Sequence, residues 1–378
     1  MLSTALNFIK KKMAAGKRPL DTVQVEITSR CNAACRMCPR GALPGWKSGD
    51  MNLALFRKVS DLIRQARHVH LQGWGEPLLH PDLLAMLKIA KDLQARVGLT
   101  TNGQLLGPET AETLIKGGID VIAVSLAGAD AKTHEQIRTG TDFRHIITNI
   151  LSLKRLKAEL GLDRPSVVIS FLMLRQNVRQ LPGVIGLAAE LGADRVSATN
   201  LDLVWDAETD GMRAFQDLGS RAARYGDLVK KARKAASSAG IDLRLYPLIP
   251  DEQPVCEANP LKNLFVSFDG CLAPCPYLGL PAAKIPRYFM GRTTSCPRLC
   301  FGNIMERTFS ETWNSRPYAE FRQQFARRLS VTASLYDQIS CDFEILEKAQ
   351  ELDQAYTARL KEMKPPRSCQ GCWKLYGV

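Results

Sequence analysis

The chain has 378 residues and a net charge of +13, from 51 basic and 38 acidic residues. Its hydrophobic content of 45% is typical of a globular protein, with room for one large domain and one smaller one. No apolar run is long enough to span a membrane, and residues 1–18 lack a signal-peptide core, so we expect a cytoplasmic protein. In a reducing cytoplasm, the eleven cysteines are expected to be metal ligands and not disulfides.

Short apolar runs alternate with longer amphipathic segments from residue 23 to about residue 198. Strands are predicted at residues 23–28, 69–72, 97–101, 121–126, 167–172 and 195–199. Helices are predicted at residues 52–67, 81–94, 108–116, 143–160 and 178–191, and a further helical segment follows residues 202–211 and runs to about residue 240. This alternation predicts an α/β fold with a parallel sheet and helices outside it, whose active site lies where the strands end.

We divide the chain into three parts. Residues 1–22 form a basic segment. Within it, the pattern over residues 2–12 predicts an amphipathic helix, which we expect to dock on the next domain. Residues 23–245 form the strand–helix domain, and a proline-rich passage marks its end. Residues 246–378 form a smaller domain that carries eight cysteines and one long charged helix over 335–363.

Three cysteines follow the first predicted strand. Cys31, Cys35 and Cys38 have the spacing C-x3-C-x2-C. Three thiolates hold three irons of a [4Fe–4S] cubane and leave one iron open to a small molecule. A zinc site and buried, inert cysteines are the alternatives, although zinc usually takes four ligands from two separated pairs.

This spacing resembles the signature of the radical S-adenosylmethionine (SAM) enzymes. The resemblance implies a partial (β/α)6 TIM-like barrel, with the amine and carboxylate of SAM bound to the open iron. It also implies that one electron, from a donor such as flavodoxin or ferredoxin, cleaves SAM to methionine and a 5′-deoxyadenosyl radical. That radical removes a hydrogen atom from the substrate.

Further motifs at the strand ends fit a SAM site. The run Gly73-Trp-Gly-Glu-Pro77 resembles the family's glycine–glycine–glutamate–proline motif, except that the family's first glycine either is replaced by Trp74 or is shifted. A carboxylate at Glu76 suits the ammonium group of SAM, and the alternative is a plain turn. By resemblance, the remaining contacts to SAM come from Met37, Gly75, Thr101, Asn102, Ser125 and Arg138.

The C-terminal cysteines predict a second cluster. Residues 266–275 predict a hairpin with an Asp-Gly turn, which could present Cys256 and Cys275 from its two ends. The chain ends with Cys369 and Cys372 in a C-x2-C pair. Four thiolates close a [4Fe–4S] cluster. This order resembles the SPASM and Twitch extensions of radical SAM enzymes, and the short C-terminus favours one auxiliary cluster. The other cysteines are expected to be free, with a second cluster or a zinc site as alternatives: Cys271, Cys296, Cys300 and Cys341.

The resemblance implies an oxidoreductase that acts on a small polar, sugar- or aminoglycoside-like substrate. Asp202, Asp206 and Asp269 are candidate bases, and a turn or surface position is the favoured alternative for each. The first alternative is an enzyme that modifies a peptide or protein. The second is a non-catalytic metal protein that binds nucleic acid through its positive charge, although no basic stripe with interleaved aromatic residues is present. The sequence leaves the substrate, the reaction outcome and the oligomeric state open.

Overall fold

The computed structural model describes residues 18–201, 203–220, 224–336 and 355–378, with the backbone alone at residues 331–336. The predicted N-terminal helix over 2–12 and most of the predicted helix over 335–363 lie outside the described residues. Of that second helix, the structure describes residues 355–362 as helical. No helix in the described ranges is both long and apolar enough to cross a membrane.

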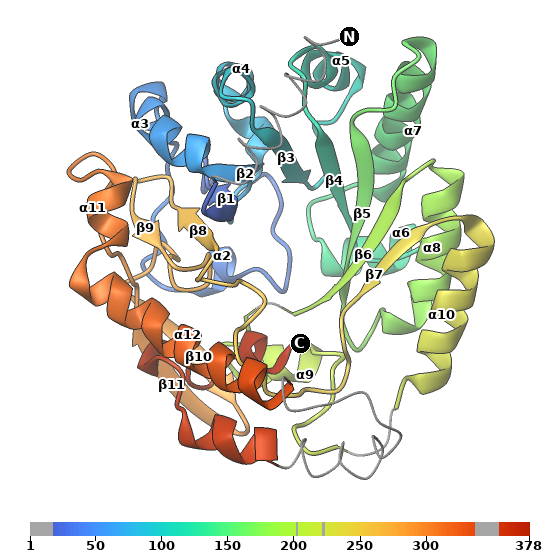
Figure 1. Cartoon of the computed structure of the whole chain (residues 1–378). Coiled ribbons are helices and arrows are strands. Elements are labelled where there is room, and N and C mark those ends of the chain that lie inside the picture. Colours follow the sequence, from blue (N-terminus) through green and yellow to red (C-terminus); the bar gives the residue numbers. More distant parts are fainter. Residues whose placement is uncertain (1–17, 202, 221–223, 337–354) are drawn as a thin grey trace, which may run out of the picture.

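A curved parallel sheet forms the centre of the molecule (Figure 1), in the order β7-β6-β5-β4-β3-β2-β1-β8-β9. The first seven strands all pair in parallel. Their bounds are β1 (Leu20–Val25), β2 (Ala66–Leu71), β3 (Arg96–Thr101), β4 (Val121–Leu126), β5 (Ser166–Met173), β6 (Arg195–Asn200) and β7 (Asp242–Leu245). The predicted α/β fold is therefore confirmed, and β7 is a strand that the sequence did not predict.

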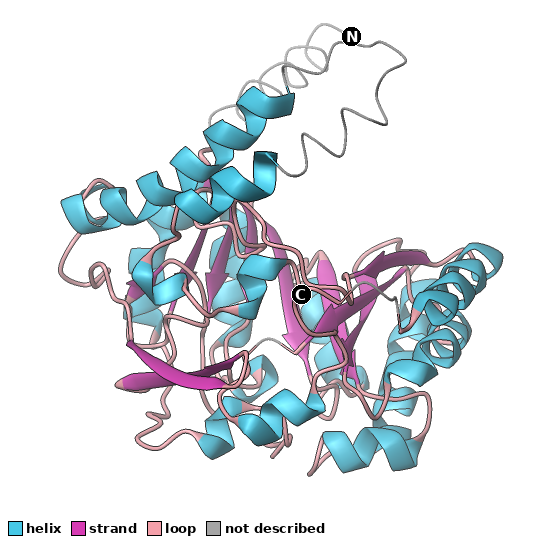
Figure 2. Cartoon of the chain, turned by 90° about the horizontal axis from the view of Figure 1, so that it is seen from below, coloured by secondary structure: helices cyan, strands magenta, loops and turns pink. Residues whose placement is uncertain are grey.

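Helices cover the outer face of this sheet (Figures 1 and 2) because each presents one apolar stripe to the strands. In α3, for example, the stripe consists of Leu55, Phe56, Val59, Leu62 and Ile63, and the Asn52 side chain caps the first turn. The outer helices are α3 (Leu53–Gln65), α4 (Leu83–Asp92), α5 (Pro108–Lys116), α6 (Ala131–Ile137), α7 (Phe143–Glu159), α8 (Leu181–Glu190) and α10 (Gly226–Ala239). The sequence predicted most of these helices within a few residues. It predicted the end of α10 but not its start, and it did not predict α6.

The C-terminal part is joined to this sheet. Strand β8 (Asn263–Val266) pairs in parallel with β1, although about 240 residues separate the two segments along the chain. Strand β9 (Leu272–Ala273) then returns antiparallel to β8, as the Asp-Gly turn predicted. The predicted boundary at residue 245 thus separates two segments that share one sheet.

The elements that follow β9 along the chain lie beyond this edge of the sheet. Strands β10 (Lys284–Phe289) and β11 (Arg292–Pro297) form a separate antiparallel ribbon. Helices α11 (Phe309–Trp313) and α12 (Arg316–Tyr336) follow, and Figure 1 shows them in orange beside the ribbon. Aromatic contacts hold this region together, because Phe301 stacks on Tyr318 with ring centroids 4.2 Å apart.

Candidate functional site

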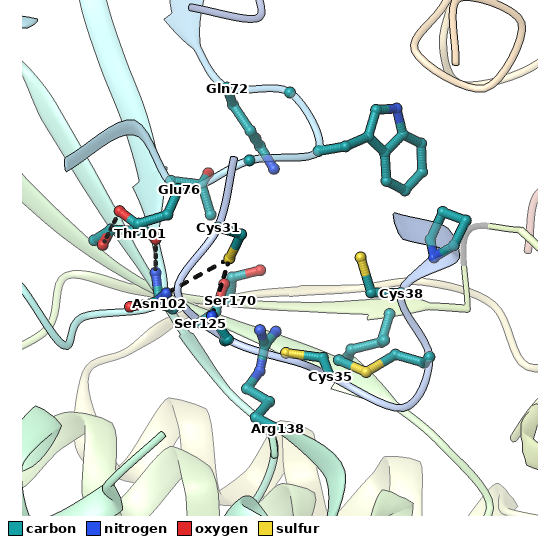
Figure 3. Close-up of a pocket in the computed structure, with 18 of the residues that line it drawn as sticks. Cys31, Cys35, Cys38, Gln72, Glu76, Thr101, Asn102, Ser125, Arg138 and Ser170 are labelled. Atoms are coloured by element: carbon teal, nitrogen blue, oxygen red, sulfur yellow. Dashed lines mark hydrogen bonds between the residues drawn. The ribbon is translucent and has the colours of Figure 1, made fainter. Parts of the chain in front are cut away.

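The cysteine loop is fixed to the barrel by its backbone. The amide of Ala34 donates to Thr139 O at 2.8 Å, and the amide of Arg36 donates to Ile137 O at 3.0 Å. These bonds tie the loop to the end of α6. Cys31, Cys35 and Cys38 all line one cavity of about 210 Å³ (Figure 3), so the structure brings the three predicted thiols together.

The carboxylate of Glu76 is held at the edge of this cavity by three donors. Its oxygens accept hydrogen bonds from Thr101 Oγ1 at 2.7 Å, from Asn102 N at 2.7 Å and from Leu78 N at 3.1 Å. Burial raises the pKa of Glu76, and the bonds from Asn102, Thr101 and Leu78 oppose that effect. A ligand ammonium group would further stabilise the ionised carboxylate.

The two glycines before Glu76 are required by packing. A Cβ atom on Gly73 would lie 2.2 Å from Glu26 Cγ, and one on Gly75 would lie 2.3 Å from the carbonyl oxygen of Thr28. The Glu76 amide also donates to Arg30 O at 2.8 Å. The glycines thus let this loop lie directly against the segment that leads into the cysteines.

Trp74 faces the C-terminal part of the chain. Its indole Nε1 donates to Pro276 O at 3.2 Å, and its ring makes an edge contact with Tyr277 at 6.0 Å between centroids. Its backbone amide donates to Glu26 Oε1 at 2.9 Å. Trp74, the residue that departs from the expected glycine motif, therefore connects the cavity wall to the residues that follow Cys275.

The other predicted SAM residues also line the cavity: Met37, Gly75, Thr101, Asn102, Ser125 and Arg138. Arg138 approaches from the end of α6 (Figure 3), and its buried Nε has no hydrogen-bond partner among the described residues. A ligand carboxylate would satisfy this guanidinium. Three thiols, a buried carboxylate and a guanidinium together fit an iron–sulfur cluster with SAM on its open iron.

A second, larger cavity of about 730 Å³ occupies the barrel interior. It shares Gln72, Thr100, Ser170 and Thr199 with the first cavity, and Cys275 lies in its wall. Glycine, alanine and serine side chains at inward positions leave this interior open. Small residues of this kind are Gly98, Ala123, Ser170 and Ser197.

His70 also lines this second cavity, although the sequence did not identify it as a site residue. Its Nε2 lies 2.9 Å from Thr100 Oγ1, and burial lowers its pKa to about 4, so the imidazole is neutral at neutral pH. The alternation along β2 could have identified it, because His68, His70 and Gln72 are spaced two residues apart and face the same side.

The four predicted auxiliary cysteines form a group. The Cys275 thiol interacts electrostatically with those of Cys256 and Cys372, and the Cys369 thiol interacts with all three. Burial raises the pKa of Cys256 to about 12, although the amides of Asn259 and Ala258 donate to this sulfur. Amide donors directed at sulfur are typical of iron–sulfur sites, and metal binding would displace the thiol protons.

The buried guanidinium of Arg287 lies beside three of these thiols, those of Cys275, Cys369 and Cys372, and beside Cys296. Its Nε and Nη1 have no hydrogen-bond partner in the described part of the chain. Such a cation fits an anionic cluster. In the same described part, no three Cys, His, Asp or Glu side chains converge as they would on a single metal ion. A cubane does not demand such convergence, because each thiolate binds a different iron.

The expectation that the remaining cysteines are free is wrong for two of them. Cys271 and Cys300 form a disulfide, with Cα atoms 5.4 Å apart, because residues 301–303 run beside β9 through hydrogen bonds such as Phe301 N to Leu272 O at 2.9 Å. They were expected to be free thiols. Cys296 is a free, buried thiol, as expected, while Cys341 lies outside the described residues.

Of the candidate bases, the two that the structure describes, Asp206 and Asp269, line neither cavity. Asp269 pairs with Arg298 at 2.7 Å and accepts from Ser267, which makes it part of the hairpin turn. Asp206 caps α9 (Ala207–Met212) through the Thr209 amide. Asp202 lies outside the described residues.

Two protein families match this chain. Residues 25–188 match the radical SAM superfamily. Residues 256–334 match the SPASM iron–sulfur cluster-binding domain.

Curated relatives match along most of the chain. The cofactor-modifying protein of tungsten-containing aldehyde ferredoxin oxidoreductase from Pyrococcus furiosus is 27% identical over 84% of this chain and 88% of its own. The AdoMet-dependent heme synthase of Methanosarcina barkeri is 25% identical over 77% of this chain and 81% of its own. The PqqA peptide cyclase of Gluconobacter oxydans is 25% identical over 79% of this chain and 78% of its own.

Solved structures share the fold. SuiB of Streptococcus suis with bound S-adenosylmethionine superposes with a TM-score of 0.57 at 18% identity, over 85% of this chain and 72% of that one. Native anSMEcpe with bound AdoMet superposes with a TM-score of 0.56 at 17% identity, over 80% of this chain and 83% of that one. Both likenesses support the barrel-plus-SPASM architecture.

Proposed function

Because the chain belongs to the radical SAM superfamily and carries a SPASM domain, we propose that it oxidises a small polar substrate by removing a hydrogen atom and then a second electron. The family's cofactors are a [4Fe–4S] cluster, SAM and SPASM auxiliary clusters. The observation that carries the proposal is the interior cavity. This cavity joins the SAM pocket at one end, and Cys275 lies in its wall. A substrate there would lie between the radical source and an electron acceptor.

When bound, SAM and its cluster supply a carbon radical that takes a hydrogen atom, and the auxiliary cluster supplies a one-electron acceptor. The protein must then accept a proton from the substrate hydroxyl as a carbonyl forms. We assign this role to His70, because its neutral imidazole lines the cavity. Burial disfavours the imidazolium that forms, so an anionic group of the substrate beside the ring must offset that cost. Gln72 and Ser170 offer hydrogen bonds that orient a polyhydroxylated substrate beside it.

The charge of the cavity wall narrows the substrate class. Among the described residues, Glu257 is the one acidic residue that lines this cavity. Four basic residues line it as well: Arg96, Arg195, Arg244 and Lys374. Two of these are balanced by ion pairs, Arg195 with Asp242 and Arg244 with Glu257. Arg96 is in none of the ion pairs that the structure describes, and its positive charge favours a substrate that carries a carboxylate or phosphate over a polycationic aminoglycoside.

The test is product analysis with the reconstituted, reduced protein and a panel of carboxylated and phosphorylated polyols. The proposal expects 5′-deoxyadenosine and a two-electron-oxidised product in equal amounts. It also expects His70→Gln to lower product formation while SAM cleavage continues, because the substrate radical then lacks its proton acceptor. An isomerised product without net oxidation would contradict the proposed reaction.

Modification of a peptide is the second candidate, because a PqqA peptide cyclase is among the relatives that match most of this chain. The discriminating result is 5′-deoxyadenosine release that responds to peptides and not to the small polar panel. A role limited to nucleic-acid binding does not agree with membership of this enzyme superfamily.

A further inference from the structure

Arg287 is a buried cation in the middle of β10. Its side chain is only 3% exposed, although arginine is almost never fully buried unless it is paired. Its Nε and Nη1 are buried, and no hydrogen-bond partner for them is found in the described ranges. The ion pairs that the structure describes do not include Arg287 either. A buried guanidinium in this state is costly unless an anion compensates it.

The groups around Arg287 are thiols. Those that interact with it electrostatically are Cys275, Cys296, Cys369 and Cys372. Three of these belong to the predicted auxiliary site, and Cys256 completes that site. The backbone agrees with this placement. Arg287 lies in β10 between Ile285, which is paired with Cys296, and Phe289, which lies against Gly371 of the C-terminal C-x2-C pair. The geometry therefore directs one fixed positive charge at one group of sulfur ligands.

Four thiolates around a [4Fe–4S] core give a net charge of about −2 in the oxidised state and about −3 after one-electron reduction. A nearby cation stabilises the more negative state more strongly, and this effect is large where water is excluded. It raises the reduction potential of the cluster, which is the direction that an electron acceptor needs.

We propose that Arg287 is a positioning residue of the auxiliary site, where its guanidinium compensates the charge of the cluster and raises its reduction potential. This inference rests on the auxiliary cluster of the proposed function. It also gives a role to Cys296, whose thiol accepts a hydrogen bond from Arg287. Cys296 is then a partner of the guanidinium and not an iron ligand.

The test is a redox titration of the anaerobically reconstituted holoprotein, monitored by EPR, together with an iron count. Arg287→Gln should keep about eight irons and lower one midpoint potential while leaving the other unchanged. We expect at least a tenfold change in the equilibrium constant for reduction, which is about 59 mV for one electron. Arg287→Lys keeps the charge and should retain most of the wild-type potential.

The matched control is Arg292→Gln, which removes an exposed cation from the neighbouring strand β11. Its potentials should equal those of the wild type, because water screens an exposed charge. Unchanged potentials in Arg287→Gln with about eight irons would overturn the inference. If Arg287→Gln loses iron, Arg287→Lys decides: recovery of iron and potential supports the role of the charge, whereas loss in both variants assigns Arg287 to packing. Wild-type protein with about four irons would contradict the auxiliary cluster itself and therefore the proposed function as well.

Discussion

Glu76 occupies a position that its neighbours define before any ligand is present. Thr101, Asn102 and Leu78 orient its two oxygens, and Thr101 and Asn102 close the adjacent strand β3. Glu76, Thr101 and Asn102 were all identified from the sequence, because motifs at the ends of parallel strands meet at one edge of the sheet. The sequence did not show that Thr101 and the Asn102 backbone act on Glu76, because that contact depends on how the two loops pack.

Glu76→Gln should lower the affinity for SAM about ten- to a hundredfold. The substitution removes the charge that faces the ligand ammonium group, and a charge-assisted hydrogen bond is worth about 1.5–3 kcal/mol. It also places an amide NH2 near the Asn102 amide, which donates to Glu76 Oε2. Calorimetric titration with SAM measures the loss. Thr101→Val is the control, since it removes one bond to Glu76 but keeps the charge, and its loss should be smaller.

Replacing Cys31, Cys35 and Cys38 together by alanine should remove about four irons per chain and abolish SAM cleavage. The reason is that these thiolates are the expected protein ligands of the catalytic cluster, and all three line the first cavity. Iron analysis and chromatography of 5′-deoxyadenosine check the two effects. Cleavage that survives in the triple variant would exclude this loop as the radical source.

At the scale of elements, the predicted boundaries agree best where local signals are strong. Strand β4 and helix α5 match their predicted ranges, because Pro108 and Gly117 mark the ends of the helix. The pairing of β8 with β1 was not predictable, since it joins segments far apart in the sequence. The same holds for the disulfide between Cys271 and Cys300, which depends on that packing.

Glu26 links two of these elements. Its carboxylate accepts from Trp74 N in the glycine loop at 2.9 Å and from Phe268 N after β8 at 3.3 Å. Burial raises its pKa to about 7, and the facing charged groups are Asp269 and Arg298. The folded protein thus holds a proton on Glu26 at a pH where the unfolded chain, with a pKa of 4.5, has released it.

The contribution of Glu26 to stability is therefore fully present below pH 4.5 and is lost as the pH rises through about 7. The loss amounts to about 3 kcal/mol at most. Relative to Glu26→Gln, which cannot ionise, the wild type should become less stable between pH 5 and pH 8. Urea denaturation of both holoproteins at the two pH values measures this difference, and a difference that does not change with pH would contradict the raised pKa.

At the scale of the whole molecule, the C-terminal cysteines lie near the barrel because β8 extends its sheet and Trp74 contacts Pro276. The sequence predicted the membership of this group from spacing and resemblance. It could not predict that Cys275 borders the interior cavity or that Arg287 lies beside the thiols. Both facts depend on tertiary packing.

The iron count separates one auxiliary cluster from two. Replacing Cys296, Cys300 and Cys341 by serine should leave about eight irons, because we expect the four other C-terminal thiols, which lie together, to hold the auxiliary cluster. Replacing Cys369 and Cys372 should remove about four irons and abolish product, while some uncoupled SAM cleavage continues at the barrel. Loss of iron from the first variant would instead indicate a second auxiliary cluster.

The central claim is that this chain holds two kinds of cluster, one open to SAM and one fully ligated beside the substrate cavity. The most direct measurement is the EPR spectrum of the reduced, reconstituted protein with and without SAM, on a sample whose iron has been counted. We expect about eight irons, one cluster signal that changes when SAM is added and a second signal that does not. A sample with about four irons, or two signals that both ignore SAM, would contradict the account.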